Sequence, residues 1–462
     1  MDTEKREVCL VNPAPRGRRQ YYDRLRVPIL GIGYIASYIR AGGHGCAVVD
    51  AKMEGLPPEA AARKAAGARP FLVGVTAMTH EIGLAHEIAS IVRSVSSGTL
   101  TAVGGAHASA LPAQTLEEFP SFDFACFNEG EETLLELLAA AGGGGDTAGV
   151  CGISRRDGGE VRVNPPREWI GDLDRLPFPA WELFPSTRTY PIIGSRGCPY
   201  RCVFCMRALG ERVRLRSPEN VFEEYRWLVR ERGAATIFFR DEVFGLKLAG
   251  AHRFLDLVVG EGLHKRARWS CQMRAGQADV ELFRKMRRAG CFEVGFGVES
   301  GNPEILREIA KGITIEQVEE AVRLAKEASL RTAAFFILGH PNETRRTAAD
   351  TVDFAARLNP TRISVGIMVP YPGTKVAEMA QKGEGGYRLL SRDWGDYDKY
   401  LGGALEVEGL PRAEMERLQT LAFIKLYLRN RRLPALAGLL FSRRREVFYM
   451  ILRLAGFVFR RR

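Results

Sequence analysis

Uninterrupted apolar runs alternate with amphipathic stretches over positions 1–140 of the chain. The apolar runs are VCLVN (8–12), CAVVD (46–50), FLVGVTAM (71–78), LTAVGGA (100–106) and FDFACF (122–127). Between them lie patterns of helical period: ILGIGYIASYIRAGG, PEAAARKAAG, HEIGLAHEIASIVRSV and EETLLELLAA. Strands that are apolar on both faces and are joined by helices are typical of parallel sheets. The pattern therefore predicts a doubly wound, Rossmann-like α/β domain over residues 1–145.

The following segment breaks this alternation. GGGGD (142–146) predicts a joint, and CGISRRDGGEVRVNPPR predicts a small hairpin that turns at Gly158-Gly159. The proline-rich stretch DLDRLPFPAWELFP (172–185) is interpreted as a linker that runs over a surface. Residues 146–186 are thus expected to form a hairpin and linker.

The alternation resumes at Tyr190 with a second set of strands. They are YPIIGS, ATIFFRD, ARWSCQ, EVGFGVES, TAAFFILG and RISVGIMVP, and each is followed or preceded by a helical pattern. Six such units fit a partial (β/α)6 barrel of the TIM type better than a complete eight-fold barrel. We expect this barrel over residues 187–400 and a basic helical extension over 401–462.

The net charge of +11 is concentrated at one end of the chain. From Pro411 to Arg462 there are 13 Lys and Arg against 3 Glu, so the remaining chain is close to neutral. A nucleic-acid-binding body would carry its own basic face. We therefore expect no nucleic-acid partner.

The apolar stretches at the basic end have two interpretations. Residues 418–462 alternate apolar segments with the basic runs Arg431-Arg432, Arg443–Arg445 and Arg460–Arg462. They form either helices packed on the barrel or an interfacial pair on an anionic membrane, where each Lys or Arg contributes about 1 kcal/mol. The second interpretation would suit a lipid substrate and a peripheral position at the inner face of a membrane.

Cysteine usage and the N-terminus indicate the compartment. MDTEKREVCLV does not resemble a signal peptide, and no uninterrupted apolar run is as long as a membrane-spanning helix requires. Nine cysteines, an odd number, argue against a full set of disulfides. We expect a cytoplasmic protein, in which clustered thiols more often bind metal than oxidise.

Three of these cysteines lie in SRGCPYRCVFC, at the spacing C-x3-C-x2-C: Cys198, Cys202 and Cys205. A coincidental loop or a zinc site with a distant fourth ligand remains an alternative. Three thiolates without a nearby fourth ligand favour an iron–sulfur cluster with one open iron. The loop follows the first barrel strand, where barrel enzymes place their chemistry, and Phe204 can shield a cluster from water.

The segment resembles the signature of the radical S-adenosylmethionine (SAM) superfamily, C-x3-C-x-aromatic-C. The resemblance implies a 4Fe-4S cluster on Cys198, Cys202 and Cys205. It also implies that SAM chelates the open iron and is cleaved by one electron. The resulting 5′-deoxyadenosyl radical then removes a hydrogen atom from the substrate.

The resemblance also assigns roles to the ends of later strands. After the second strand, Arg240, Asp241 and Glu242 are expected near the methionine amino group of SAM. Arg274 is expected to pair with its carboxylate, and Glu299 and Ser300 with its ribose hydroxyls. Cys271 and Cys291 are interpreted as packing residues.

Small residues follow two strands of the N-terminal domain, in VGVTAMT (73–79) and VGGAHAS (103–109). Doubly wound sheets bind cofactors at such strand ends. Gly104 and Gly105 would let a bulky ligand approach the backbone, and Thr76 or Thr79 can offer a hydroxyl.

As a whole, residues 5–140 resemble the cobalamin-binding domains that precede radical SAM barrels. The stretches are VPILGIGYIASYIRAGGH, the Thr76 region, Gly104-Gly105 and FNEGEETLLELL. D-x-H-x-x-G, which supplies a cobalt ligand elsewhere, is absent. His44, His80, His86 and His107 are therefore expected at the surface or in loops, with His107 nearest the nucleotide tail and no histidine on cobalt.

The combined resemblance is to cobalamin-dependent methyltransferases and to the anaerobic magnesium-protoporphyrin cyclase-like group. It implies methylation of an unactivated carbon of a small molecule or lipid, with the methyl group carried by cobalamin and electrons from a flavodoxin or ferredoxin. Three alternatives stay open: cyclisation or rearrangement without methyl transfer, a tRNA-modifying methylthiotransferase, and a non-enzymatic sensor. The scattered Cys9, Cys46 and Cys126 disfavour the second cluster that a methylthiotransferase would carry.

Overall fold

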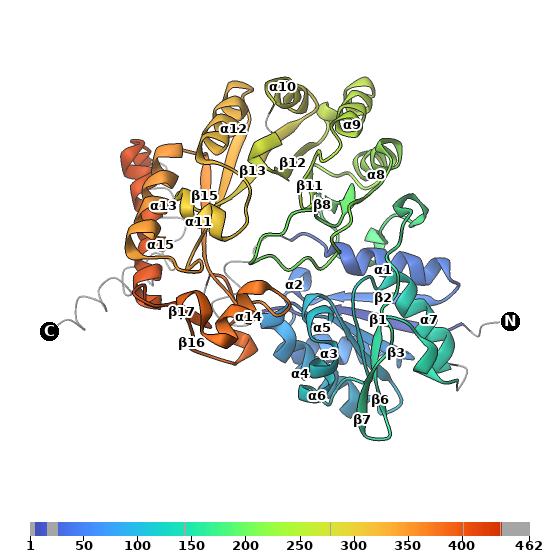
Figure 1. The fold of residues 1–462 in the computed structure, drawn as a ribbon. Coiled ribbons are helices and arrows are strands. Elements are labelled where there is room, and N and C mark those ends of the chain that lie inside the picture. Colours follow the sequence, from blue (N-terminus) through green and yellow to red (C-terminus); the bar gives the residue numbers. More distant parts are fainter. Residues whose placement is uncertain are drawn as a thin grey trace.

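The computed structural model describes residues 5–15, 26–142, 145–277, 279–400, 402–434 and 436. Figure 1 shows two α/β units, with the N-terminal unit in blue and cyan and the larger one in green to orange. Both units combine a mainly parallel sheet with covering helices, as the alternating patterns predict. The basic runs predicted at Arg443–Arg445 and Arg460–Arg462 lie outside the described residues.

The N-terminal sheet has the strand order β2-β1-β3-β4-β5-β6-β7. Its strands are β1 (Glu7–Asn12), β2 (Gly45–Asp50), β3 (Leu72–Thr76), β4 (Leu100–Gly104), β5 (Phe124–Cys126), β6 (Ile153–Asp157) and β7 (Glu160–Val163). The first five are parallel, and the predicted hairpin joins their edge as antiparallel β6 and β7. The doubly wound sheet is confirmed, and the hairpin extends it.

Helices cover both faces of this sheet. They are α1 (Leu30–Ala41), α2 (Ala51–Glu54), α3 (Pro58–Ala66), α4 (Ile82–Val95), α5 (Ala106–Ala110), α6 (Pro112–Glu118) and α7 (Glu131–Gly142). Cys9 and Val11 of β1 pack with α3 and α4 on one face, whereas Val8 and Leu10 pack with α1 and α7 on the other. This alternation follows from the two-residue side-chain period of a strand.

The second unit is an open barrel with the strand order β15-β14-β13-β12-β11-β8, all parallel. The strands are β8 (Thr189–Ile192), β11 (Thr236–Phe239), β12 (Arg268–Met273), β13 (Cys291–Glu299), β14 (Arg331–Leu338) and β15 (Arg362–Ile367). The helices are α8 (Pro218–Arg230), α9 (Leu248–Gly260), α10 (Val280–Arg288), α11 (Pro303–Glu308), α12 (Ile315–Glu327) and α13 (Arg345–Leu358). The partial six-strand barrel is confirmed.

A C-terminal layer closes one side of the barrel. It contains α14 (Lys375–Lys382), the hairpin β16 (Tyr387–Leu389) and β17 (Leu405–Val407), and α15 (Arg412–Arg429). Figure 1 shows α15 beside α13, and its buried face includes Met415, Leu418, Ala422 and Leu426. For this first part of the basic extension, the interpretation of a helix packed on the barrel holds. None of the described helices is long and apolar enough to span a bilayer.

The expectation of a surface linker over residues 172–185 is wrong. Trp181 is 1% exposed and Phe184 6%, because both fill the space between α1 and the barrel. A Cβ on Gly33 of α1 would lie 2.7 Å from the Trp181 ring. Apolar side chains thus make one continuous core from Val8 and Leu10 through Trp181 to Tyr190 of β8.

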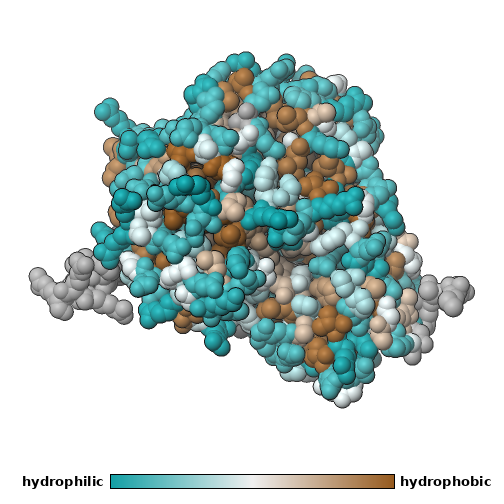
Figure 2. Space-filling model, in the orientation of Figure 1, coloured by the Kyte–Doolittle hydropathy of each residue, from teal (hydrophilic) through white to brown (hydrophobic). Residues whose placement is uncertain are grey.

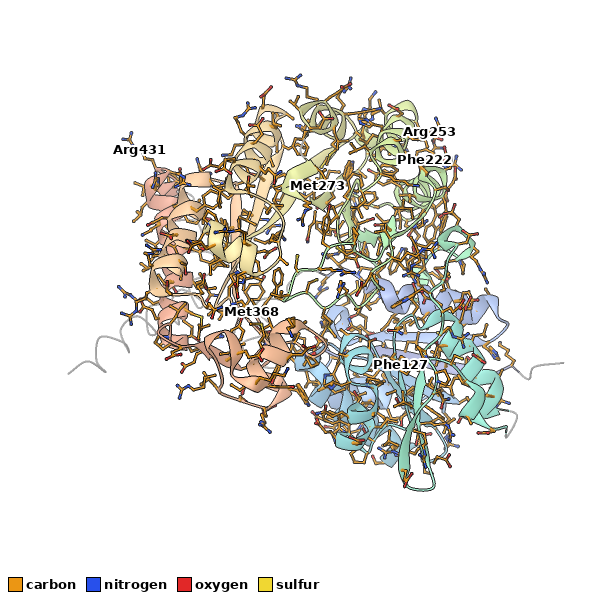
Figure 3. The ribbon with its side chains drawn as sticks, viewed as in Figure 1. Phe127, Phe222, Arg253, Met273, Met368 and Arg431 are labelled. Atoms are coloured by element: carbon orange, nitrogen blue, oxygen red, sulfur yellow. The ribbon has the colours of Figure 1, made fainter. Side chains whose placement is uncertain are left out.

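The visible outer face is mainly hydrophilic, with separate apolar patches (Figure 2). Figure 3 labels Phe127 in the N-terminal unit and Met273 and Met368 near the carboxyl ends of β12 and β15. The three side chains are buried, with 6%, 3% and 3% of their surface exposed. In both units, buried side chains therefore pack at the carboxyl ends of strands, where the loops begin.

Candidate active site at the carboxyl ends of the barrel strands

The three-cysteine loop is connected to the barrel by a short pair of antiparallel strands, called the neck below. β9 (Ser195–Arg196) and β10 (Arg214–Leu215) pair antiparallel, and the loop over 197–213 lies between them. Gly197 has a φ of 89°, and a Cβ there would lie 2.3 Å from the carbonyl oxygen of Arg212. The Cys198 amide donates to the Gly210 carbonyl at 3.1 Å. Only glycine fits the neck, so the geometry of the loop is fixed beside its first cysteine.

The loop keeps all three thiols away from the apolar core. Cys198 and Cys202 are half-buried, and Cys205 is exposed. Desolvation raises the pKa of Cys202; Lys311 and Arg274 act in the opposite direction, and Glu299 and Cys198 raise it further. Within the described residues, no three His, Cys, Asp or Glu side chains converge on a point suited to a single metal ion. The loop presents separate thiols with cationic side chains nearby.

Glu299 ends β13 in a strained conformation. Its φ is 68°, and the pairing register between β13 and β14 shifts between Gly297 and Glu299. Its carboxylate accepts from Lys311 Nζ at 2.7 Å, and Lys311 lies 5.9 Å from the Phe204 ring centroid. Non-glycine residues adopt this conformation mainly where the surroundings impose it, often at functional sites. Glu299, Lys311 and Phe204 therefore link the end of β13 to the cysteine loop.

Arg274, just after β12, also reaches the loop. Its guanidinium stacks on Tyr200 at 3.7 Å and donates to the Lys311 carbonyl oxygen. No acidic side chain pairs with Arg274 in the part of the chain that the structure describes. A guanidinium that is positioned but lacks a carboxylate is suited to a carboxylate ligand.

The two acids predicted after β11 differ in their surroundings. Asp241 accepts from the Gly194 amide and, at 2.6 Å, from the Ser195 hydroxyl, so it holds β9 to β11. Glu242 has a buried Oε2 to which none of the described residues donates, and desolvation raises its pKa. A buried carboxylate oxygen without a partner is costly. Glu242 is therefore the better match to a cationic ligand group.

Ser300 is fully buried in the fold. Its hydroxyl lies 3.0 Å from Thr351 Oγ1 of α13 and accepts from the Asn302 amide at 3.1 Å. These bonds anchor the turn between β13 and α11. A role of Ser300 toward ribose stays a prediction.

The turn after β14 contributes two buried groups, His340 and Glu343, to which the sequence motifs gave no role. Burial lowers the pKa of His340 to about 4, and its Nε2 lies 3.3 Å from the Glu299 carbonyl oxygen. Glu343 accepts from the amides of Gly339 and His340, and burial raises its pKa to about 7. His340 packs 6.1 Å from Phe204. The signal was available, because polar residues in HPNE follow directly on a buried strand.

The glycine-rich edge of the N-terminal sheet is shaped by Gly105. Its φ is 103°, and a Cβ would lie 2.7 Å from the Ala77 carbonyl oxygen and 3.0 Å from Thr76 Oγ1. A Cβ on Gly104 would have no heavy atom of the described chain closer than 3.8 Å. Gly105 is required by the packing of β3 against β4, whereas Gly104 leaves space beside the strand end.

His107, in helix α5, corrects the expectation of a surface or loop histidine, whereas His44 lies in the turn between α1 and β2, as expected. His107 is fully buried against Trp394 and Phe119, with ring centroids 5.0 and 6.4 Å away, and burial lowers its pKa to about 4. Among the described residues, neither ring nitrogen finds a hydrogen-bond partner. His44 is 6% exposed and its Nδ1 accepts from the Arg6 amide. The sequence did not show that residues 394–397 fold back over α5.

A buried ion-pair network joins the two units beside the cysteine loop. Glu129 and Glu131, after β5, pair with Arg196 at 2.7 and 2.6 Å, and Glu129 also pairs with Arg214 at 2.7 Å. All four side chains are at most 6% exposed. Arg196 and Arg214 are the two sides of the neck of the loop. Ion pairs therefore connect the end of the N-terminal sheet to the two strands that carry the cysteine loop.

These residues fit the cofactors that the sequence predicts. Cys198, Cys202 and Cys205 can each give one thiolate to an iron–sulfur cluster, while Cys271 and Cys291 are buried in the barrel core. Arg274 and the buried Oε2 of Glu242 suit the carboxylate and ammonium of SAM. The space beside Gly104 suits a bulky ligand at the N-terminal sheet edge.

Two family matches coincide with the two units. Residues 192–355 match the radical SAM superfamily, and residues 24–138 match the B12 binding domain. The chain is 33% identical, over 411 residues, to an uncharacterised methyltransferase of Pyrococcus horikoshii, which covers 87% of this chain and 88% of the relative. The chain belongs to the cobalamin-dependent radical SAM family. Its cofactors are accordingly a 4Fe-4S cluster, SAM and cobalamin.

A further relative and a solved structure are similar to this chain. The chain is 29% identical over 363 residues to an anaerobic magnesium-protoporphyrin IX monomethyl ester cyclase of Cereibacter sphaeroides, covering 75% of this chain and 59% of the cyclase. The fold matches the radical SAM methyltransferase TsrM of Kitasatospora setae, solved with cobalamin and a [4Fe-4S] cluster. That match has a TM-score of 0.72 and 24% identity, and it covers 90% of this chain and 91% of TsrM.

Proposed function

We propose that this radical SAM enzyme methylates an unactivated carbon of a small-molecule or lipid substrate. The observation that carries the proposal is the buried network of Glu129 and Glu131 with Arg196 and Arg214. It holds the edge of the cobalamin-binding sheet against the loop that carries the cluster ligands. Transfer between two cofactors needs such fixed proximity, because a misplaced radical is lost to side reactions.

When bound, the cluster and SAM supply a one-electron route to a substrate radical, and cobalamin supplies the methyl group. Within this site the buried Oε2 of Glu242 would accept a hydrogen bond from the SAM ammonium, and the Arg274 guanidinium would pair with the SAM carboxylate. Glu299, whose carboxylate is oriented by Lys311, would accept a hydrogen bond from a ribose hydroxyl. Phe204, whose ring lies near His340 and Lys311, would limit access of water to the cluster.

The remaining partners belong to the same proposal. The substrate is a small molecule or a lipid, and the electron donor is a flavodoxin or ferredoxin. Reduced, clustered thiols suit a cytoplasmic enzyme.

Anaerobic reconstitution with iron, sulfide and cobalamin tests the cluster assignment. The Cys198→Ala/Cys202→Ala/Cys205→Ala variant should lose bound iron and 5′-deoxyadenosine formation from SAM. A matched Cys271→Ala/Cys291→Ala variant, with its substitutions in the barrel core, should retain both. Equal iron and turnover in the triple variant and the parent protein would overturn the proposal.

Cobalamin binding is tested separately at Gly104. Gly104→Val should fold normally, because space surrounds its Cβ, yet lose most of the bound cobalamin. Gly149→Val, which also places its Cβ in open space, is the control and should retain cobalamin. If Gly104→Val binds as much cobalamin as the parent protein, cobalamin does not bind beside Gly104.

Product mass distinguishes methylation from the cyclase reaction of the second relative. Methyl transfer adds one CH2 increment, whereas cyclisation or rearrangement does not add carbon. A turned-over product without added carbon would retain the radical SAM assignment and reject methyl transfer.

A further inference from the structure

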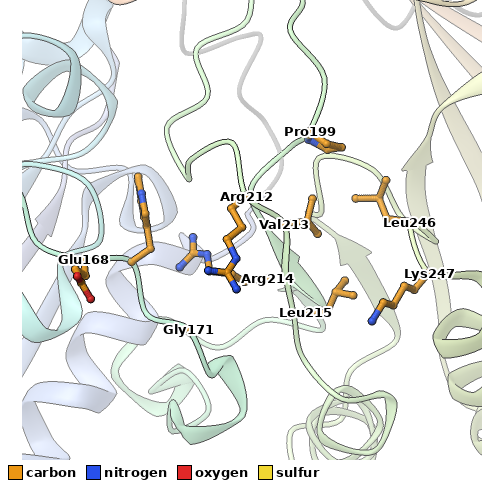
Figure 4. A pocket seen from close by; sticks show the side chains of 10 residues that line it. Glu168, Gly171, Pro199, Arg212, Val213, Arg214, Leu215, Leu246 and Lys247 are labelled. Atoms are coloured by element: carbon orange, nitrogen blue, oxygen red, sulfur yellow. The ribbon is translucent and has the colours of Figure 1, made fainter.

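A cavity of about 790 Å³ lies beside the cysteine loop. Its lining comes from three segments that are distant in sequence (Figure 4): Glu168 and Trp169 before η4 (Leu173–Arg175), Pro199 and Arg212 of the loop, and Leu246 and Lys247 before α9. Pro199 is exposed and directly follows Cys198. The cavity is therefore a place where the loop next to a cluster ligand reaches the protein surface.

The rim of this cavity carries exposed cations. Arg212 and Lys247 are both exposed, and neither forms an ion pair within the described parts of the chain. Arg201 of the same loop is 81% exposed and lies 3.9 Å from Glu211. Glu168 is the acidic residue in the lining. The rim is thus basic although the body of the protein outside the C-terminal extension is nearly neutral.

Apolar side chains form one part of the cavity lining, between the charged residues. Leu246 and Leu215 line the cavity, and Leu215 is 36% exposed. Trp169 lies 5.0 Å from the Arg214 guanidinium, which the buried pair with Glu129 fixes. A small apolar centre with a charged rim is the form of weak electron-transfer interfaces, in which charge guides a brief encounter.

We propose that this surface docks a small, acidic one-electron carrier protein of the flavodoxin type, which reduces the cluster through the Cys198–Pro199 side of the loop. The inference rests on the proposed function, since it names the partner of the same cluster. One electron passes from the reduced carrier to the oxidised cluster, and no bond forms between the two proteins. Arg212 and Lys247 attract the carrier, and Trp169 and Leu215 make the apolar contact.

The test compares two charge reversals in the full-length protein. Arg212→Glu/Lys247→Glu inverts the proposed rim. Lys265→Glu/Arg266→Glu is the matched control, because it inverts an exposed lysine and arginine just before β12, at the amino end of the barrel strands. The probe is an acidic bacterial flavodoxin, used oxidised for binding and as its hydroquinone for cluster reduction.

Binding of oxidised flavodoxin is measured on protein without a cluster, and cluster reduction is measured on reconstituted protein. The rim variant should bind flavodoxin about tenfold or more weakly, and its bimolecular reduction rate should fall by a similar factor with a shallower salt dependence. The control variant should match the parent. Dithionite, a small reductant, should reduce the cluster of all three proteins equally fast.

Three results would overturn the docking proposal: unchanged flavodoxin binding in the rim variant, an equal loss in the control variant, or an equal slowing with dithionite. Failure of the proposed function has a different signature. Dithionite would then reduce the cluster without SAM cleavage or methylated product, while flavodoxin binding would still depend on the rim. The two failures are therefore distinguishable.

Discussion

Two buried regions of this protein differ in whether their acidic side chains form ion pairs. At the domain junction, defined by Glu129, Glu131, Arg196 and Arg214, acids meet guanidinium groups within 2.6–2.8 Å. At the barrel mouth, defined by the ends of β11 to β14, Glu242 and Glu343 each retain a buried oxygen, and His340 a buried nitrogen, without a partner among the described residues. At the junction each carboxylate meets a guanidinium, although Arg214 Nε has no partner among the described residues. At the barrel mouth the acids Glu242 and Glu343 meet no cationic side chain within ion-pair distance in the described parts of the chain.

The presence or absence of a partner distinguishes polar groups that hold the fold together from polar groups that are available to a ligand. A buried ion pair adds little stability compared with apolar side chains of the same size, but removing one partner is strongly destabilising. We therefore interpret such a pair as holding two parts of the fold in a fixed position. A buried polar group that lacks a partner costs stability, so its presence suggests a ligand that completes it. Asp241 and Glu242, adjacent in sequence, fall on opposite sides of this division.

Breaking the junction should have the largest effect on stability. Glu129→Ala leaves Arg214 and part of Arg196 buried without their acid, which we expect to lower the free energy of unfolding by about 3–5 kcal/mol. Chemical denaturation measures this loss. Glu219→Ala, which removes an exposed ion pair with Arg253, is the control and should leave the midpoint unchanged. Equal midpoints for the two variants would contradict the assigned role of the junction.

At the barrel mouth, Glu343 should make stability dependent on pH. Its pKa rises from 4.5 to about 7 on folding, so the folded state favours the protonated form. Stability is fully present below pH 4.5 and is lost as pH rises through 7, by up to about 3 kcal/mol. Glu343→Gln should abolish this decline, since an amide oxygen still accepts from Gly339 and His340. A variant whose unfolding free energy still falls over this range would assign the decline to another group.

Substitutions of the neighbouring acids Asp241 and Glu242 should have the smallest effects on stability, but the two variants should differ in SAM binding. Asp241→Asn weakens bonds to Ser195 and Gly194, and we expect a loss of about 1–3 kcal/mol. Glu242→Gln should not lower the unfolding free energy, because it removes a carboxylate that burial disfavours and whose buried oxygen accepts no hydrogen bond from the described residues. Calorimetric titration should instead show weaker SAM binding for Glu242→Gln. Undiminished SAM affinity in that variant would place the ligand elsewhere.

Much of the site was visible from local patterns. Cys198, Cys202 and Cys205 lie close together in one loop, and strand ends such as that of β13 follow buried runs, so periodicity and spacing located them. Trp181 was misjudged because proline-rich polar surroundings indicate a surface path, while its burial depends on Gly33 of a distant helix. His107 was misjudged for the same reason, since Trp394, which covers it, comes from the far end of the chain.

By itself the sequence determined both α/β units, the cysteine loop and the family, because strand and helix periods and ligand spacing are local properties of the chain. Only the tertiary structure decided which acids are paired. Glu129 and Glu242 both follow a strand and precede a glycine-containing turn, but Glu129 meets Arg196 and Arg214 across the junction, whereas Glu242 keeps a buried oxygen to which none of the described residues donates. The pairing of a buried charge depends on the groups that the fold brings to it, and these come from positions that no local pattern connects.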